Sequence, residues 1–150
     1  SFLETMVDYV NTGRISLDPT ANAKPVTYHD PCYLGRHNGE YGSARKVLTA
    51  LPGVTLREMD RSMQNALCCG GGGGNLFTDI IGSGPESPAR NRVMEALGTE
   101  AHVLAVSCPI CAVMLEDAVK STNLDERIQV QEISEMCTRP SMPLPSLNDT

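Results

Sequence analysis

The sequence predicts an α/β fold in which a small open parallel sheet of about four strands carries helices on both faces. Three observations support this. Strand-like and helix-like segments alternate along the 150 residues, which implies parallel strands joined by right-handed crossovers. The run His-Val-Leu-Ala-Val at 102–106 is apolar enough for a central strand covered on both faces. Cysteines follow three of the strand-like segments, which would bring them to the carboxyl edge of the sheet.

The first half of the chain predicts a helix, a strand, a second helix and a second strand. Residues 2–10 have helical spacing of apolar side chains, and we expect residues 1–23 to form an N-terminal helix and linker. The absence of an initiator methionine suggests a piece of a longer chain. Residues 25–29 are expected to form a strand, 43–51 a helix and 54–59 an edge strand.

In the second half, Pro88 suits the first turn of a helix that runs to Leu97, and Pro109 suits the start of another with Cys108 as its cap. Strands are expected near 102–107 and 128–133. The predicted order of strands in the sheet is 2-1-3-4. Residues 24–137 would form the domain and 138–150, with three prolines, a flexible tail.

The amino-acid composition restricts the core, the partners and the cellular compartment. Aromatic residues make up only 4%, so aliphatic side chains and methionine must fill the core. A formal charge of −6 argues against a nucleic-acid partner. No apolar run approaches the roughly 20 residues of a membrane span, and no signal-peptide pattern opens the chain. Six cysteines in a chain with an ordinary core indicate a reducing compartment, and we expect a cytoplasmic protein.

The most unusual stretch is 67–75, Leu-Cys-Cys-Gly-Gly-Gly-Gly-Gly-Asn. Neighbouring cysteines seldom bridge to each other, and five glycines are costly to order. A soft metal centre explains both features, because thiolates are its preferred ligands and backbone N–H groups stabilise its negative charge. Cys68 and Cys69 are therefore expected to be ligands, and Gly70, Gly71 and Gly72 to let the backbone approach the bound group.

The other cysteines strengthen this interpretation. Cys32 lies upstream in His-Asp-Pro-Cys, and Cys108 and Cys111 form a Cys-x-x-Cys motif downstream. A lone Cys-x-x-Cys is a weak signal, since redox pairs and zinc sites also use it. Taken with Cys68 and Cys69, these residues give five candidate metal ligands from three loops. Cys137 lies outside the pattern and is expected to be a spare thiol.

These motifs resemble those of the cysteine-rich CCG domain of heterodisulfide reductase and related iron–sulfur oxidoreductases, over roughly residues 25–135. The resemblance implies that Cys32, Cys68, Cys69, Cys108 and Cys111 bind a [4Fe–4S] cluster, of a non-cubane kind in heterodisulfide reductase. It also implies that the chain is a domain or subunit of an oxidoreductase that relays electrons or reduces a disulfide. Expected partners are ferredoxin-like, flavoprotein or membrane quinone-linked redox subunits, with association to a membrane complex.

Two alternatives remain open from the residues. Zinc could staple the loops of a non-catalytic interaction module, although five thiolates exceed what a tetrahedral ion needs. A thiol–disulfide enzyme using Cys108 and Cys111 alone would leave the paired cysteines and the glycines unexplained. Around the site, His29 is a candidate ligand or proton donor but suits a hydrogen-bonded turn better, and Arg36 is a candidate for contact with an anionic group or the cluster.

Overall fold

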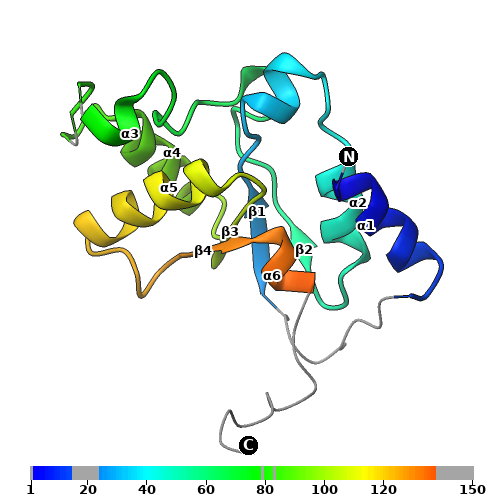
Figure 1. Ribbon diagram of the computed structural model, residues 1–150. Coiled ribbons are helices and arrows are strands. Elements are labelled where there is room, and N and C mark those ends of the chain that lie inside the picture. The colour runs from blue at the N-terminus through cyan, green and yellow to red at the C-terminus, as the bar shows by residue number, and fades with distance from the viewer. Residues whose placement is uncertain (1, 15–23, 79, 83, 138–150) are drawn as a thin grey trace, which may run out of the picture.

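A computed structural model describes residues 2–14, 24–78, 80–82 and 84–137. Within these ranges the chain forms one open parallel sheet (Figure 1). The strands run in the order β2-β1-β3-β4, and every pairing is parallel. This confirms the predicted fold class and strand order. The strands are β1 (Pro25–Tyr28), β2 (Thr55–Leu56), β3 (Val103–Val106) and β4 (Gln129–Glu132).

The two central strands are mostly buried, because helices cover both of their faces. All four residues of β3 are buried, whereas β2 and β4 at the edges are partly exposed. The register pairs Val26 with Val103 and Val103 with Gln129. Edge strands need less apolar side-chain surface, because one side of each lacks a neighbouring strand.

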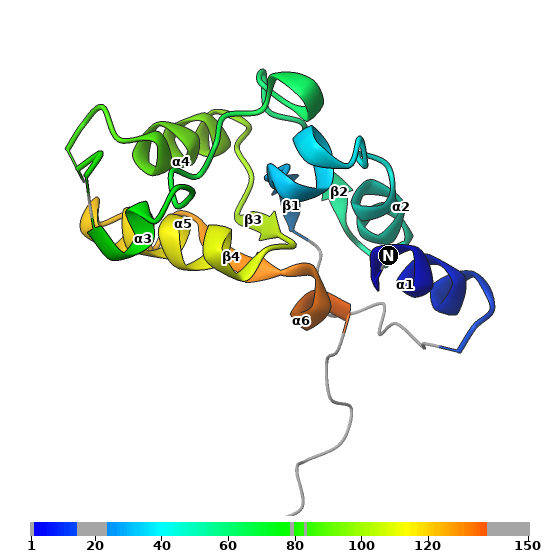
Figure 2. The same cartoon turned by 45° about the horizontal axis from the view of Figure 1, so that its top comes forward.

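Alternate side chains of the sheet point to opposite faces and pack in two separate hydrophobic cores. Val103 and Ala105 pack with helices on one face, and Leu104 and Val106 pack with helices on the other, as the period of two along a strand requires. The first set of helices is α1 (Phe2–Asn11), α2 (Ser43–Ala50) and α6 (Ile133–Cys137). The second set is α4 (Pro88–Gly98) and α5 (Pro109–Ser121). Figure 2 shows the two sets on opposite sides of the strands.

The two predicted proline-led helix starts are confirmed. Ser87 caps α4, its Oγ accepting a hydrogen bond from the Arg90 N–H at 3.3 Å, and Pro88 follows it. Cys108 is the N-cap residue of α5, with Pro109 in the first turn, but its side chain makes no capping hydrogen bond. The Cys108 sulfur is therefore not used in holding the helix end.

Four short elements were not predicted. They are a π-helix η1 (Tyr33–His37), a 3-10 helix η2 (Met63–Asn65), α3 (Asn75–Thr78) and α6. The expected strand 128–133 was wrong at its end, because Ile133 begins α6, and the expected strand 54–59 was too long. Elements of three to five residues are too short to leave a periodic pattern. The expected linker and tail, at 15–23 and 138–150, lie outside the described residues.

A buried ion pair anchors the turn after β1. The Asp30 carboxylate accepts hydrogen bonds from Arg45 Nη1 at 2.7 Å and Nη2 at 2.9 Å, and from the Met63 backbone N–H at 2.8 Å. Met63 has a φ of 54°, in the left-handed region that non-glycine residues seldom adopt. Asp30 thus holds together the end of β1, the helix α2 and the loop that leads to Cys68.

Replacement of Arg45 by Met should lower the free energy of unfolding by about 3–5 kcal/mol, because it leaves the buried Asp30 carboxylate without its counter-ion. Asp30 is 3% exposed and Arg45 11%. Glu100→Gln is the matched control, since the Arg57–Glu100 pair is exposed and should contribute less than about 1 kcal/mol. Urea unfolding measures both, and equal losses would contradict a structural role for Asp30.

Candidate metal centre

The parallel sheet brings three cysteine-bearing loops to one edge. Cys32 follows β1, Cys68 and Cys69 follow β2, and Cys108 and Cys111 follow β3. Because the strands are parallel, each of these loops leaves the same, carboxyl, edge of the sheet. The fold therefore supplies the convergence on which the sequence prediction depends.

Cys69 and Cys111 form the inner part of the candidate site. Both are buried, and their Sγ atoms and one ring nitrogen of His29 all lie within 4.8 Å of one another. A hydrogen bond with the Cys111 thiol raises the pKa of Cys69 to about 11. The pKa of Cys68 is raised above its ordinary value, mainly by a hydrogen bond with Cys69 and to a smaller extent by burial. Cys68, Cys69 and Cys111 are thus one connected group of sulfur atoms.

Cys32 and Cys108 lie nearer the surface than Cys69 and Cys111. Both are half-buried, like Cys68. Cys32 and Cys68 line the same small cavity, and Cys108 packs at the start of α5, one turn before Cys111. The Gly70 backbone N–H donates a hydrogen bond to Cys68 Sγ at 3.3 Å, the contact by which a backbone amide stabilises an anionic sulfur.

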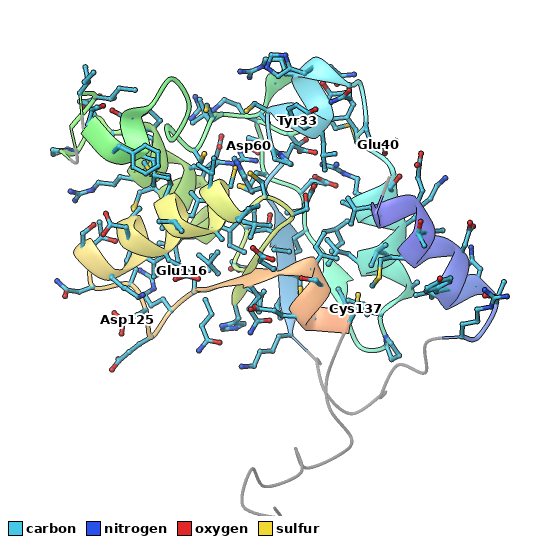
Figure 3. All side chains as sticks on the ribbon, in the orientation of Figure 1. Tyr33, Glu40, Asp60, Glu116, Asp125 and Cys137 are labelled. Atoms are coloured by element: carbon cyan, nitrogen blue, oxygen red, sulfur yellow. The ribbon has the colours of Figure 1, made fainter. Side chains whose placement is uncertain are left out.

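Cys137 lies apart from these residues. It is buried in the core formed with α1 and α2, on the other face of the sheet from Cys69 and Cys111. Figure 3 shows Cys137 on α6, well separated from Tyr33, the residue that follows Cys32. Burial raises the pKa of Cys137 to about 11, as expected of a thiol that is packed in a core.

His29 is a buried, hydrogen-bonded residue that directly follows β1. Its side chain is 1% exposed, and its Nδ1 accepts a hydrogen bond from Arg92 Nε at 3.1 Å. The pKa of His29 is lowered to about 3, mainly by burial and to a smaller extent by the positive charge of Arg92. The ring is therefore neutral at ordinary pH. Its Nε2 atom has no hydrogen-bond partner among the residues that the structure describes.

Arg36 lies on the cavity that Cys32 and Cys68 share. Its Nη2 donates a hydrogen bond to the Ala66 carbonyl oxygen at 2.9 Å. This contact ties η1 to the loop before the paired cysteines and keeps a positive charge beside Cys68, where it favours anionic sulfur.

The glycines that follow Cys69 differ in their surroundings. Gly70 has a φ of +84°, and a Cβ on Gly71 would lie 2.6 Å from Ile110 Cγ2 and 2.9 Å from Met114 Cγ of α5. Gly72 has open space around it. Gly71 is therefore required by close packing of the loop on α5, whereas the role expected for Gly72 remains a prediction.

Two residues that support the site, Asn75 and Arg92, were not predicted to do so. Asn75 is buried, its Nδ2 donates to the Gly70 carbonyl oxygen at 3.0 Å, and its Oδ1 accepts from the Ile81 N–H at 2.9 Å. Asn75 therefore ties the glycine loop to the segment that follows α3. Arg92 is the other. The sequence signal for its burial is its helical spacing from Ala89 and Ala96, which places it on the inward face of α4.

The donor set fits an iron–sulfur cluster. Thiolates are the ligands of such clusters, and hydrogen-bond donors to the sulfurs tune them. Cys68, Cys69 and Cys111 form one group, Cys32 shares a cavity with Cys68, and the Gly70 N–H donates to the Cys68 sulfur. The buried Nε2 atom of His29 faces no protein acceptor within the described ranges, which leaves a polar atom for a bound group to satisfy.

Residues 26–116 match the family described as CCG, the cysteine-rich domain. The chain is 45% identical over 127 residues to a probable membrane-anchored ferredoxin of Chromohalobacter salexigens, covering 85% of this chain and 18% of that protein. It is 39% identical over 133 residues to one of the subunits of the dihydromethanophenazine:CoB–CoM heterodisulfide reductase of Methanosarcina barkeri, covering 87% and 31%.

A third relative is a probable iron–sulfur-binding oxidoreductase of Bacillus subtilis, 32% identical over 133 residues, with 89% of this chain and 18% of that protein covered. The chain thus spans less than a third of the length of these relatives. No solved structure matches it. Among the described residues, no helix is both long and apolar enough to cross a membrane.

Gly71→Val should lower the free energy of unfolding by about 1–3 kcal/mol, because the new side chain collides with Ile110 and Met114. Gly72→Val should change it by less than about 0.5 kcal/mol, since nothing lies near that position. Urea unfolding of the two purified variants measures the difference. Equal destabilisation would show that the loop does not pack on α5 as described.

Proposed function

Because this chain belongs to the CCG cysteine-rich domain family, we propose that it is the iron–sulfur redox domain of an oxidoreductase. The observation that supports the proposal is that three cysteine-bearing loops leave the same edge of the parallel sheet. A structural zinc ion almost always takes four ligands, so a site made of five cysteines would favour a larger centre. The names of two of the relatives point the same way, to a ferredoxin and an iron–sulfur-binding oxidoreductase.

The proposed centre is a [4Fe–4S] cluster of the non-cubane kind, held by the five cysteines named above. When bound, such a cluster supplies one-electron transfer. The chain's part is to hold the sulfurs as thiolates. The Gly70 N–H, the positive end of α5 at Cys108 and the charge of Arg36 all favour the anionic form. Because Gly70, Gly71 and Gly72 have no side chains, the backbone of this loop can approach the cluster closely.

Electrons would enter or leave at the outer part of the site. Cys32 and Cys108 are half-buried, and beside them Tyr33 is 71% exposed and Ile110 44% exposed. A redox partner or a disulfide substrate could therefore approach this edge without any change in the buried pair, Cys69 and Cys111. The domain would relay electrons or reduce a disulfide here.

The partners we propose are other redox segments or subunits. Two relatives, by name, are a heterodisulfide reductase subunit and an EtfAB:quinone oxidoreductase, and this chain spans 31% and 19% of their lengths. Ferredoxin-like, flavoprotein or quinone-linked partners would supply and remove electrons. Six cysteines without disulfides suit a cytoplasmic position, where thiols stay reduced, and the complex would be associated with a membrane.

Chemical analysis of anaerobically purified protein tests the nature of the centre. We expect a brown protein with about four iron and about four acid-labile sulfide per chain, and an EPR signal on one-electron reduction or oxidation. The measurement is iron and sulfide content together with EPR spectra. A colourless protein that holds one zinc ion would overturn the proposal and support the zinc-stapled interaction module.

Serine replacement tests the ligand set. Each of Cys32→Ser, Cys68→Ser, Cys69→Ser, Cys108→Ser and Cys111→Ser should lower iron content and change the EPR spectrum, because serine is a poor ligand for a soft metal centre. Cys137→Ser is the matched control, since Cys137 is buried like Cys69 and Cys111 but packs on the other face of the sheet. If Cys137→Ser lost as much iron as the five other variants, the proposed ligand set would be wrong.

A further inference from the structure

Arg92 fixes the position of the proton on the ring of His29. The Arg92 side chain is fully buried, and its Nε donates to His29 Nδ1 at 3.1 Å. A guanidinium keeps its proton and has no acceptor atom, so it can only donate. Nδ1 must therefore carry the lone pair. The ring proton of neutral His29 is left on Nε2.

Arg92 is itself held by hydrogen bonds through a second nitrogen of its guanidinium. Its Nη1 donates to the Arg61 carbonyl oxygen and to Glu95 Oε2, both at 2.7 Å, and Arg61 Nε donates to Glu95 Oε1 at 2.7 Å. These contacts join α4 to the loop that follows β2. The guanidinium is thereby oriented from two segments, and its Nε points at His29.

The Nε2–H group of His29 needs an acceptor. It is buried and has no hydrogen-bond partner among the residues the structure describes, and an unpaired buried donor is costly. A ring nitrogen of His29 lies within 4.8 Å of the Sγ atoms of both Cys69 and Cys111. Nδ1 is already occupied by Arg92, so Nε2 is the nitrogen that can serve these sulfurs.

We propose that His29 donates an Nε2–H···S hydrogen bond to Cys69 or Cys111 when the cluster is bound, and that Arg92 is the positioning residue that enforces this tautomer. The proposal rests on the proposed iron–sulfur function. Hydrogen bonds to ligand sulfur set the potential of a cluster. This one stabilises the more negative, reduced state, so it raises the reduction potential.

The same contacts exclude His29 as a metal ligand. Coordination through Nε2 would require a lone pair on that atom and a proton on Nδ1. The Nδ1–H would then face the Arg92 Nε–H, donor against donor, in a buried place. His29, Cys69 and Cys111 are close enough to suggest a three-ligand ion site, but Arg92 makes the histidine a donor.

Pulsed EPR on reduced protein labelled with ¹⁵N-histidine tests the role of His29 directly. A hydrogen-bonded nitrogen should give a weak coupling to the cluster, and a coordinated nitrogen a strong one. The other two histidines described, His37 and His102, are exposed. A strong coupling would overturn the inference while leaving the iron–sulfur function intact, whereas a protein without iron would overturn both.

Redox titration followed by EPR tests the effect on potential. His29→Phe should keep its iron, and at a fixed potential its ratio of reduced to oxidised cluster should fall about tenfold, or about 59 mV for one electron. His29→Gln keeps an N–H donor and should restore part of the shift. His102→Phe is the control. Iron loss from His29→Phe, or an unchanged potential with full iron, would overturn the inference.

Arg92→Gln removes the obligatory donor and tests the positioning role. We expect the cluster to remain and its potential to fall in the same direction as in His29→Phe, because the ring can then adopt either tautomer. Arg90→Gln, on the same helix and less buried, is the matched control. A potential equal to that of the unaltered protein would show that Arg92 only supports the fold.

Discussion

The arrangement of the loops at the carboxyl edge of the sheet depends on one buried carboxylate, that of Asp30. Asp30 lies at the end of β1 and is bonded at once to α2, through Arg45, and to the loop after β2, through the Met63 N–H. A buried charge is tolerated here because the carboxylate accepts three hydrogen bonds, two of them from a guanidinium. Its neighbour His29 makes the corresponding contact on the opposite face, with Arg92 of α4. Two successive residues thus fasten the cysteine loops to both helical layers.

The candidate site is part of the core rather than an addition to it. Cys69 and Cys111 pack with Leu104, Val106 and the inner side chains of α4 and α5. The glycine loop lies so close to α5 that Gly71 has no room for a side chain, and Asn75 closes the loop on itself. Packing therefore orders part of a segment that, from its composition, could have depended on metal alone.

Much of the architecture could be predicted because the relevant information is local. A short β-type run marks β1, an apolar run marks β3, and Pro88 and Pro109 mark two helix starts, so the strand order followed from topology rules. Arg92 could not be predicted in the same way. A charged residue is expected at the surface, and its partners Arg61 and His29 are far away in sequence. The cluster itself and its five ligands remain predictions, since chain topology brings thiols together without deciding which metal they hold.

The parallel pairing of β1 with β3 has a consequence for how a newly made chain matures. Val26 pairs with Val103, so the two central strands meet only after the whole intervening segment has been synthesised. Sheets built from such distant pairs form slowly. Until they form, the cysteine thiols remain apart and accessible to oxidants, which can convert them to sulfenic acid or disulfides. Exposure to oxygen should therefore do more damage to this protein during its synthesis than after Cys69 and Cys111 have been buried.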